Sequence, residues 1–319
     1  MEALTALVAP DLKAVNDLIV RRMHSPVAMI PQLAGYIIAA GGKRLRPVLT
    51  LAAARLCGYT GQRHHALAAC VEFIHTATLL HDDVVDESLM RRGQASANAV
   101  FGNQASVLVG DFLFSRAFQL MVEDGSLEVL GILSRASAVI AEGEVLQLSR
   151  AHSLEMTQQD YLEIVTAKTA ELFAAACQVG AVVADRPATE VAALRRYGLA
   201  LGMAFQMADD VLDYRSGLGK SPGDDFREGK VTLPVLLAFH AGDDQEKAFW
   251  KQTMEDKTQK DGDLEHAQAL LVRRHAPQAT LDMARQHTQQ AWQTLNAFPD
   301  SPARQALTDI LDFVVNRAR

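Results

Sequence analysis

Six aspartates occur in two segments that share the spacing Asp-Asp-x-x-Asp: Asp82, Asp83, Asp86, Asp209, Asp210 and Asp213. Residues four apart on a helix lie on one face, one turn apart, so the outer carboxylates of each segment come close together. Such carboxylates repel, and each raises the pKa of the other unless a cation lies nearby. Mg²⁺ prefers one or two carboxylates together with phosphate oxygens. The spacing therefore indicates magnesium-assisted phosphate chemistry.

The position of both segments argues against two ordinary acidic helix ends. A single Asp-Asp-x-x-Asp is as often a solvated helix end as a metal site. Here both segments end apolar helical runs, where the helix dipole disfavours acidic side chains. Two clusters that break the same rule in the same way indicate functional sites. If they face each other, they form a carboxylate-lined mouth suited to a molecule with a polyanionic head and an apolar tail.

Basic residues are concentrated in two places, on a glycine turn and after the first aspartate segment. Gly41-Gly-Lys-Arg-Leu-Arg-Pro47 carries Lys43, Arg44 and Arg46 on a glycine turn, an arrangement that suits anion binding, although an ordinary helix C-cap with solvated charges is also compatible. Arg91 and Arg92 follow the first aspartate segment and have the fork geometry that binds phosphate.

Composition narrows the class of protein. The chain has 319 residues, of which 49% are hydrophobic and 6% aromatic, and this favours helices over strands. The net charge of −7 argues against nucleic acid as a partner. Three cysteines (Cys57, Cys70 and Cys177) without Cys-x-x-Cys spacing are typical of reduced thiols in a cytoplasmic protein.

No targeting or membrane segment is expected. The N-terminus has an early acid and no basic n-region, which argues against a signal peptide. The longest apolar run, about 172–184, is too short to cross a bilayer. We expect a soluble protein.

Helical periodicity extends over nearly the whole chain, without a persistent strand pattern, a repeat or a linker. We expect a single domain over residues 1–319, with a loop at 87–95 and a polar surface elaboration at 242–263. The expected helices are 3–24, 26–40, 47–57, 64–86, 96–101, 104–123, 126–148, 157–184, 188–215, 231–240, 245–256, 263–273, 277–295 and 301–317.

Several motifs together resemble those of the trans-isoprenyl diphosphate synthases. In chain order they are Gly-Gly-Lys-Arg-Leu-Arg-Pro, His-Asp-Asp-x-x-Asp with Arg-Arg-Gly, Gly-Glu-x-x-Gln, Lys-Thr, Gln-Met-Ala-Asp-Asp-x-x-Asp, Gly-Asp-Asp-Phe-Arg-Glu-Gly-Lys and the terminal Phe-Val-Val-x-Arg. They cover nearly the whole chain. The resemblance implies an all-α isoprenoid synthase fold, a helical bundle around a central cavity, and usually a homodimer.

The resemblance also implies a role for each matching residue. Two or three Mg²⁺ ions would be bound by Asp82, Asp86 and Asp209, supported by Asp83, Asp210 and Asp213. Isopentenyl diphosphate would be bound by Lys43, Arg46, His75 and Arg92, and His75 lies two turns below Asp82 on the same face. The allylic diphosphate would be bound by Arg91, Lys168, Thr169, Gln206 and Lys230, with Gln147 and Lys220 as weaker candidates.

The implied reaction needs no protein nucleophile. Magnesium, Arg91, Lys168 and Lys230 would stabilise the charge that develops on the allylic diphosphate as its C–O bond breaks. The double bond of isopentenyl diphosphate then attacks the allylic cation. Loss of a proton to the departing diphosphate gives an all-trans product five carbons longer.

Product length is indicated by the residues before Asp82. In this family the positions four and five places upstream act as a floor, and here they are the small residues Thr78 and Ala77. A helical wheel places Thr78, Val71 and Ile74 nearer the Asp82 face than Ala77, so the limiting residue stays open. We expect a product of forty to fifty carbons, made from farnesyl diphosphate for quinone side chains and passed to membrane enzymes.

Three alternatives remain. A short-chain farnesyl or geranylgeranyl synthase would take its floor from another helix. A class I terpene cyclase is disfavoured by the second aspartate segment and by the basic glycine turn. A non-catalytic subunit of a heteromeric synthase tends to lose these residues, which this chain keeps.

Overall fold

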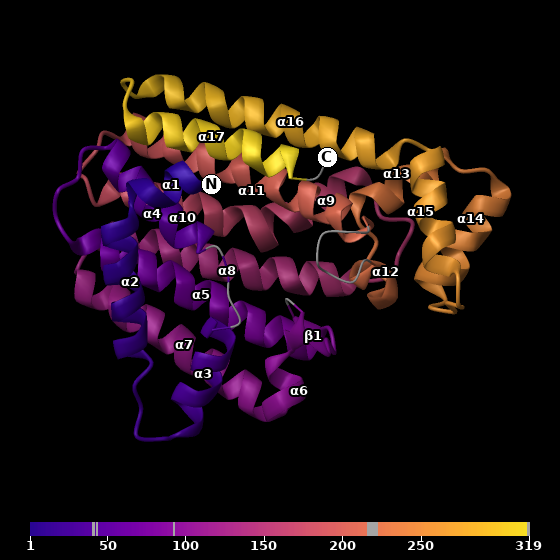
Figure 1. Ribbon diagram of the computed structural model, residues 1–319, viewed down its shortest axis with the longest axis horizontal. Coiled ribbons are helices and arrows are strands. Elements are labelled where there is room, and N and C mark those ends of the chain that lie inside the picture. The colour runs from indigo at the N-terminus through magenta and orange to yellow at the C-terminus, as the bar shows by residue number, and fades with distance from the viewer. Residues whose placement is uncertain (40–41, 43, 92, 216–222, 318–319) are drawn as a thin grey trace. The chain divides into compact units, whose positions relative to one another are not determined.

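The computed structural model describes residues 1–39, 42, 44–91, 93–215 and 223–317 (Figure 1). These residues are almost entirely helical, which confirms the expected all-α class. The chain divides into two compact units. Unit 1 comprises residues 1–137, 172–198 and 294–310, and unit 2 comprises residues 138–171, 199–293 and 311–319.

Seven helices of unit 1 come from the N-terminal part of the chain: α1 (Glu2–Leu7), α2 (Ala9–Arg22), α3 (Met29–Ala39), α4 (Leu45–Leu56), α5 (Arg63–Val85), α6 (Ala97–Phe101) and α7 (Asn103–Asp124). The division between units falls within or at the ends of longer elements: α8 (Leu127–Ser149), α10 (Glu171–Val182), α11 (Ala188–Asp213), α16 (Ala276–Thr294) and α17 (Pro302–Asn316). A short 3₁₀ turn, η3 (Leu295–Ala297), precedes α17.

Helix α5 forms the centre of unit 1 and packs most extensively against α7, and also against α4 and α2 (Figure 1). Its apolar residues Val71, Phe73 and Ile74 are fully buried. Gly110 of α7 allows close approach, because a Cβ atom there would lie 2.3 Å from Nε2 of His81. His81 donates a hydrogen bond to the Val107 carbonyl at 3.2 Å, so this histidine joins α5 to α7.

Helix α7 is long and apolar enough to cross a membrane by length and composition alone, with a mean hydropathy of 1.4 over 18 residues. The sequence analysis did not single it out. Core helices of soluble proteins pass the same test, and α7 buries Leu113, Ala117 and Leu120. Its packing along α5 is consistent with a soluble protein.

Two expectations for the N-terminal region need correction. The helix expected at 3–24 is divided into α1 and α2 at Val8, whose φ of −112° and ψ of 13° interrupt the helix. The loop expected at 87–95 contains two short antiparallel strands, β1 (Met90–Arg91) and β2 (Gln94–Ala95), in which Met90 pairs with Ala95. Strands of two residues are too short to produce a detectable alternation.

Unit 2 contains α9 (Gln158–Val165), the π-helical segment η1 (Thr166–Ala170), α12 (Asp224–Glu228), α13 (Leu233–Ala241), α14 (Asp244–Trp250), the π-helical segment η2 (Lys251–Glu255) and α15 (Asp263–Arg273). The helix expected at 157–184 is thus interrupted by η1. Gly143 of α8 permits this segment to approach closely, because a Cβ there would lie 2.6 Å from the Ala167 Cβ and 3.0 Å from the Lys168 amide nitrogen. π-Helical turns often occur at functional sites.

The polar stretch at 242–263 belongs to the core of unit 2 and is more than a surface elaboration. Trp250 and Met254 are fully buried and pack in one cluster with Tyr214 and Phe226. The sequence pattern was misleading because α14 is short and buries two residues, of which one is the polar Glu246. An Asp243 capping box with Glu246 fixes the start of this helix.

Candidate active site

The first aspartate motif ends α5, as expected. Asp82 lies in the last turn, Asp83 is fully buried, and Asp86 is the C-cap residue. Five half-buried residues follow a helical spacing along one face of α5: His75, Thr78, Leu79, Asp82 and Asp86. The motif therefore shares a face with the two upstream residues expected to bind diphosphate and to limit chain length.

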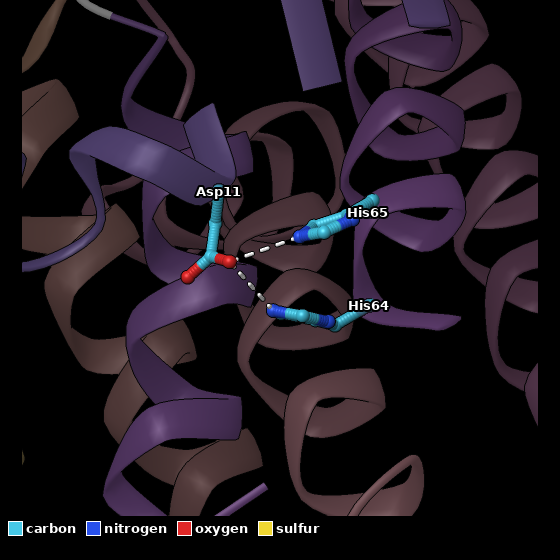
Figure 2. A group of neighbouring side chains, drawn as sticks. All are labelled: Asp11, His64 and His65. Carbon is cyan, nitrogen blue, oxygen red and sulfur yellow. Dashed lines mark hydrogen bonds and ion pairs between the residues drawn. The ribbon is translucent and has the colours of Figure 1, made fainter. Parts of the chain in front are cut away.

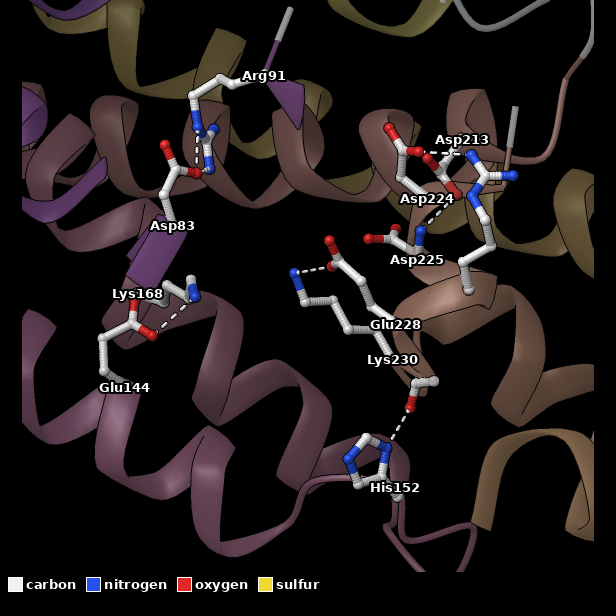
Figure 3. Close-up of polar contacts among 12 residues, drawn as sticks. Asp83, Arg91, Glu144, His152, Lys168, Asp213, Asp224, Asp225, Glu228 and Lys230 are labelled. Carbon is white, nitrogen blue, oxygen red and sulfur yellow. Dashed lines mark hydrogen bonds and ion pairs between the residues drawn. The ribbon is translucent and has the colours of Figure 1, made fainter. Parts of the chain in front are cut away.

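Arg91 pairs with the middle aspartate of this motif. Its Nε donates to Asp83 Oδ1 at 2.6 Å, and its Nη2 lies 2.5 Å from the same oxygen (Figure 3). Burial lowers the pKa of Arg91, but the hydrogen bond and charge of Asp83 outweigh burial and raise it above its ordinary value. Asn98 donates to the Asp83 carbonyl at 3.1 Å and ties this helix end to α6. The β1–β2 hairpin therefore supplies the counter-charge of Asp83.

The described part of the basic glycine turn lies against α5. Arg46 Nη1 lies 3.1 Å from His75 Nε2, so two residues expected to bind isopentenyl diphosphate come together in unit 1. The Arg46 guanidinium also stacks 4.5 Å from the centre of the Phe173 ring. Stacking and a ring nitrogen thus fix the orientation of this cation.

Arg44 and Glu72 form an ion pair that the sequence analysis did not assign. Arg44 has a left-handed φ of 47° at the start of α4, and its side chain pairs with the nearly buried Glu72 of α5. The Arg44 Nη2 also donates to the Ile38 carbonyl at 3.3 Å. This pair holds the start of α4 on α5 and sets the position from which Arg46 extends.

The second aspartate motif ends α11 and has neutral partners at its middle residue. The buried Asp210 accepts from the Tyr161 hydroxyl at 2.6 Å and from the Gln206 amide at 2.8 Å. The Thr169 hydroxyl donates to Gln206 at 3.0 Å. Burial and the charges of Asp209 and Asp213 raise the pKa of Asp210 to about 6, although these hydrogen bonds oppose the shift. Thr169 and Gln206, both expected in the allylic site, therefore belong to one hydrogen-bonded chain that ends at Asp210.

Asp209 pairs with Arg317 near the end of the chain. The Arg317 Nη2 lies 2.8 Å from Asp209 Oδ1 and donates to the Phe205 carbonyl at 3.2 Å. The same guanidinium lies 4.1 Å from the centre of the Phe205 ring. The sequence indicated Arg317 through the terminal Phe-Val-Val-x-Arg motif, but it did not predict that Asp209 is the partner of this arginine.

The third aspartate of this motif faces the α12 segment. Asp213 Oδ2 accepts from the Asp225 backbone amide at 3.0 Å, and Figure 3 shows Asp213, Asp224 and Asp225 together. Burial raises the pKa of Asp213. Burial and the charge of Asp213 raise the pKa of Asp225 well above its ordinary value, although Lys230 opposes the shift. Hard carboxylate oxygens with raised pKa values fit a divalent cation such as Mg²⁺.

Both candidate lysines have carboxylate partners within unit 2. Lys168 Nζ, in η1, lies 2.7 Å from Glu144 of the Gly-Glu-x-x-Gln motif, and Lys230 Nζ lies 2.6 Å from Glu228 (Figure 3). His152 holds the backbone beside Lys230 through a 2.9 Å hydrogen bond between Nδ1 and the Gly229 carbonyl. The lysine pairs are partly exposed, and such pairs are weak enough to exchange partners.

The remaining expected residues divide into two groups. Lys43, Arg92 and Lys220 lie outside the described residues. Ala77 is fully buried, whereas Thr78 is half-buried and its hydroxyl donates a hydrogen bond to the His75 carbonyl at 2.8 Å.

All three cysteine thiols are free, and those of Cys70 and Cys177 are buried.

Residues 27–271 match the family model described as polyprenyl synthetase. The chain is 44% identical over 326 residues to octaprenyl diphosphate synthase of Escherichia coli (strain K12), with 100% of this chain and 99% of that protein covered. The structure resembles a decaprenyl diphosphate synthase from Rhodobacter capsulatus, with a TM-score of 0.96 and 53% identity over 100% of this chain and 99% of that one.

A polyprenyl synthase from Caulobacter crescentus CB15, solved with calcium and isoprenyl diphosphate, has a TM-score of 0.97 and 53% identity over 100% of this chain and 98% of that one. These neighbours confirm the all-α isoprenoid synthase fold. The family uses a divalent metal ion to bind diphosphate. The chain belongs to the polyprenyl synthetase family.

Proposed function

We propose that the protein extends an allylic diphosphate, with farnesyl diphosphate as the primer, by successive condensation with isopentenyl diphosphate. The observation that carries the proposal is a complete Asp-Asp-x-x-Asp motif at the C-terminal end of both α5 and α11. Family membership makes the chain a trans-prenyltransferase, as its motifs led us to expect.

The product is a long all-trans-polyprenyl diphosphate, because full-length relatives make octaprenyl and decaprenyl chains. We assign a length of forty to fifty carbons and a role in ubiquinone side chains. Such a product is strongly apolar, which supports its transfer from a cytoplasmic enzyme to enzymes in the membrane.

Mg²⁺ is the cation that best fits the proposed site, with two or three ions held by Asp82, Asp86 and Asp209. Calcium in the Caulobacter crescentus structure supports a site for hard divalent cations. When bound, the metal neutralises charge that develops on the diphosphate leaving group. The buried Asp83 and Asp210 and the half-buried Asp213 support these ligands.

The basic residues of the chain perform the remaining steps. Arg46 and His75, with Lys43 and Arg92, bind the diphosphate of isopentenyl diphosphate and orient its double bond. Arg91, Lys168 and Lys230 stabilise the departing diphosphate as the allylic C–O bond breaks, while Thr169, Gln206 and Lys220 orient it. The new carbon–carbon bond forms at the allylic cation, and the proton that is lost passes to the released diphosphate.

Thr78 is the better candidate than Ala77 for the floor that limits chain length. Thr78 shares the half-buried face of His75 and Asp82, whereas Ala77 lies in the packed interior. A bulky residue at Thr78 therefore enters the path of the growing chain, whereas the same residue at Ala77 overpacks the core. The helical wheel alone did not decide which residue limits the chain.

We also propose a homodimer and a single catalytic domain. Four exposed apolar residues on α7 suit a second copy of the chain: Val107, Leu108, Phe118 and Val122. The family match at residues 27–271 extends over parts of both units, which supports one domain over 1–319. Analytical ultracentrifugation tests the dimer, and replacement of Leu108 and Val122 by lysine is expected to shift it to monomer.

The proposal is tested by incubating the purified chain with farnesyl diphosphate, isopentenyl diphosphate and Mg²⁺, then chromatographing the dephosphorylated products. We expect forty- to fifty-carbon alcohols. Products of fifteen or twenty carbons support a short-chain synthase, and a cyclic hydrocarbon supports a terpene cyclase. Absence of turnover without a partner protein supports a non-catalytic subunit, and each of these results contradicts the proposal.

A further inference from the structure

A cluster of two histidines and one aspartate lies in unit 1, and its histidines are at the opposite end of α5 from the aspartate motif. Asp11 comes from α2, and His64 and His65 come from the first turn of α5 (Figure 2). One ligand atom from each residue lies within 4.8 Å of the others. Both imidazole Nε2 atoms approach Asp11 Oδ1, at 3.5 Å from His64 and 2.9 Å from His65.

These separations match a tetrahedral metal site. With metal–ligand bonds of about 2.0–2.1 Å, two ligands of a tetrahedral zinc ion lie about 3.3 Å apart. The observed distances of 2.9 and 3.5 Å bracket that value. Small side-chain movements therefore accommodate an ion, without a change in the backbone of α2 or α5.

His64 is the strongest indication of a ligand. It is 1% exposed, and neither of its ring nitrogens has a hydrogen-bond partner among the described residues. Figure 2 shows its ring directed at Asp11. A buried polar nitrogen without a partner destabilises the folded state. A bound cation removes part of that destabilisation.

The ionisation states are those that a metal requires. Burial lowers the pKa of His64 to about 4, and the charges of His65 and Arg55 act in the same direction, so the imidazole is neutral near pH 7. Although burial opposes it, hydrogen bonds from His65 and Arg55 lower the pKa of Asp11, so its carboxyl is ionised. Metal binding therefore requires no proton release from these two side chains at neutral pH.

Arg55 is the main competitor and also the orienting group. Its Nε and Nη2 donate to Asp11 Oδ2 at 2.9 and 2.8 Å, and Nη2 is 3.1 Å from Oδ1. The stronger contacts are to Oδ2, so Oδ1 can turn to a metal while Arg55 keeps the carboxylate in place. The guanidinium charge weakens binding, and its side chain is 40% exposed, so solvent screens that repulsion.

We propose that Asp11, His64 and His65 form a structural site for a divalent transition-metal ion of the zinc class. Two imidazoles and one carboxylate suit Zn²⁺, Co²⁺ and Ni²⁺ rather than Mg²⁺. A water molecule completes the fourth position. The ion joins α2 to the start of α5 and stabilises unit 1, and it takes no part in the prenyl transfer.

Metal-stripped protein, with Mg²⁺ in excess to occupy carboxylate sites, is titrated with Co²⁺ and with Zn²⁺. We expect one equivalent of Co²⁺ to give the visible absorption band of a tetrahedral site, and Zn²⁺ to displace it. Zn²⁺ should also raise the thermal midpoint of unfolding, because it binds the folded state. Absence of both the band and the shift in the wild-type protein overturns the proposal.

Variants locate the site. His65→Gln and His64→Gln are expected to weaken Co²⁺ affinity at least tenfold, whereas His287→Gln, a half-buried histidine of α16, is the matched control and should bind as the wild type does. Circular dichroism checks that each variant folds. If His64→Gln does not fold, His65→Gln still tests the site, because His65 is half-buried. Equal Co²⁺ affinity of His65→Gln and the wild type would refute the site.

Discussion

The two aspartate motifs have the same spacing, but their middle residues have different kinds of partner. Asp83 pairs with a guanidinium from the β1–β2 hairpin, whereas Asp210 accepts from a phenol and an amide. The neutral donors at Asp210 do not offset the effect of burial on its pKa. The pKa of Asp210 therefore rises to about 6. Identical short motifs thus acquire different electrostatics from partners outside the motif.

The largest effect on turnover is expected from the outer aspartates, and it should be similar for both motifs. Asp82→Ala and Asp209→Ala should each lower turnover at least about 10³-fold, because each removes a proposed ligand of the ions that stabilise the leaving group. Steady-state assays with labelled isopentenyl diphosphate measure this loss, with circular dichroism as the folding control. Near-normal turnover in either variant would refute the metal assignment of that motif.

The middle aspartates should differ in stability. Asp83→Asn leaves the half-buried Arg91 without its nearest counter-charge, which costs about 1.5–3 kcal/mol of unfolding free energy. At pH 5, Asp210→Asn replaces a carboxyl that is mostly protonated, because its pKa is raised to about 6, and should change stability by about 1 kcal/mol or less. Urea unfolding of both variants in metal-free buffer at pH 5 gives the comparison. Equal losses would show that the two environments are equivalent.

The residues four places before each motif should separate chain length from turnover. In α5 this residue is Thr78, four positions before Asp82. In α11 it is Phe205, which stacks on Arg317. Thr78→Phe should shorten the product, while Phe205→Leu should lower turnover about tenfold, by loosening the contact between Arg317 and Asp209, and keep the product length. Chromatography of the products reports both effects.

Ala77→Phe is the matched control for Thr78→Phe. Because Ala77 is fully buried, its replacement should destabilise the protein by about 1–3 kcal/mol and affect product length less. An unchanged product in Thr78→Phe, or a shorter product only in Ala77→Phe, would contradict the choice of Thr78.

A pH dependence of stability is expected from Asp210. A carboxyl whose folded pKa is raised contributes stability that is present below its unfolded pKa of 3.8 and is lost as pH rises through about 6. Asn at position 210 does not titrate. In metal-free buffer the wild type should therefore lose stability relative to Asp210→Asn between about pH 4 and pH 7. A constant difference between the two proteins would contradict the raised pKa.

Periodicity and short motifs predicted the helical class and, to within two residues, the ends of α5 and α11. They did not predict the β1–β2 hairpin, because strands of two residues have no period, or η1, because a π-helical turn leaves the apolar pattern intact. Glu72, Glu144 and Arg317 were missed as partners, because a contact between residues far apart in sequence depends on packing.

The central claim is that both aspartate motifs are needed to bind one allylic diphosphate together with Mg²⁺. Calorimetric titration with a non-hydrolysable thiolo analogue of farnesyl diphosphate tests it directly, in the presence and absence of Mg²⁺. The wild type should bind the analogue only with Mg²⁺, and both Asp82→Ala and Asp209→Ala should lose at least about tenfold in affinity. Mg²⁺-dependent binding of wild-type strength in either variant would contradict the claim.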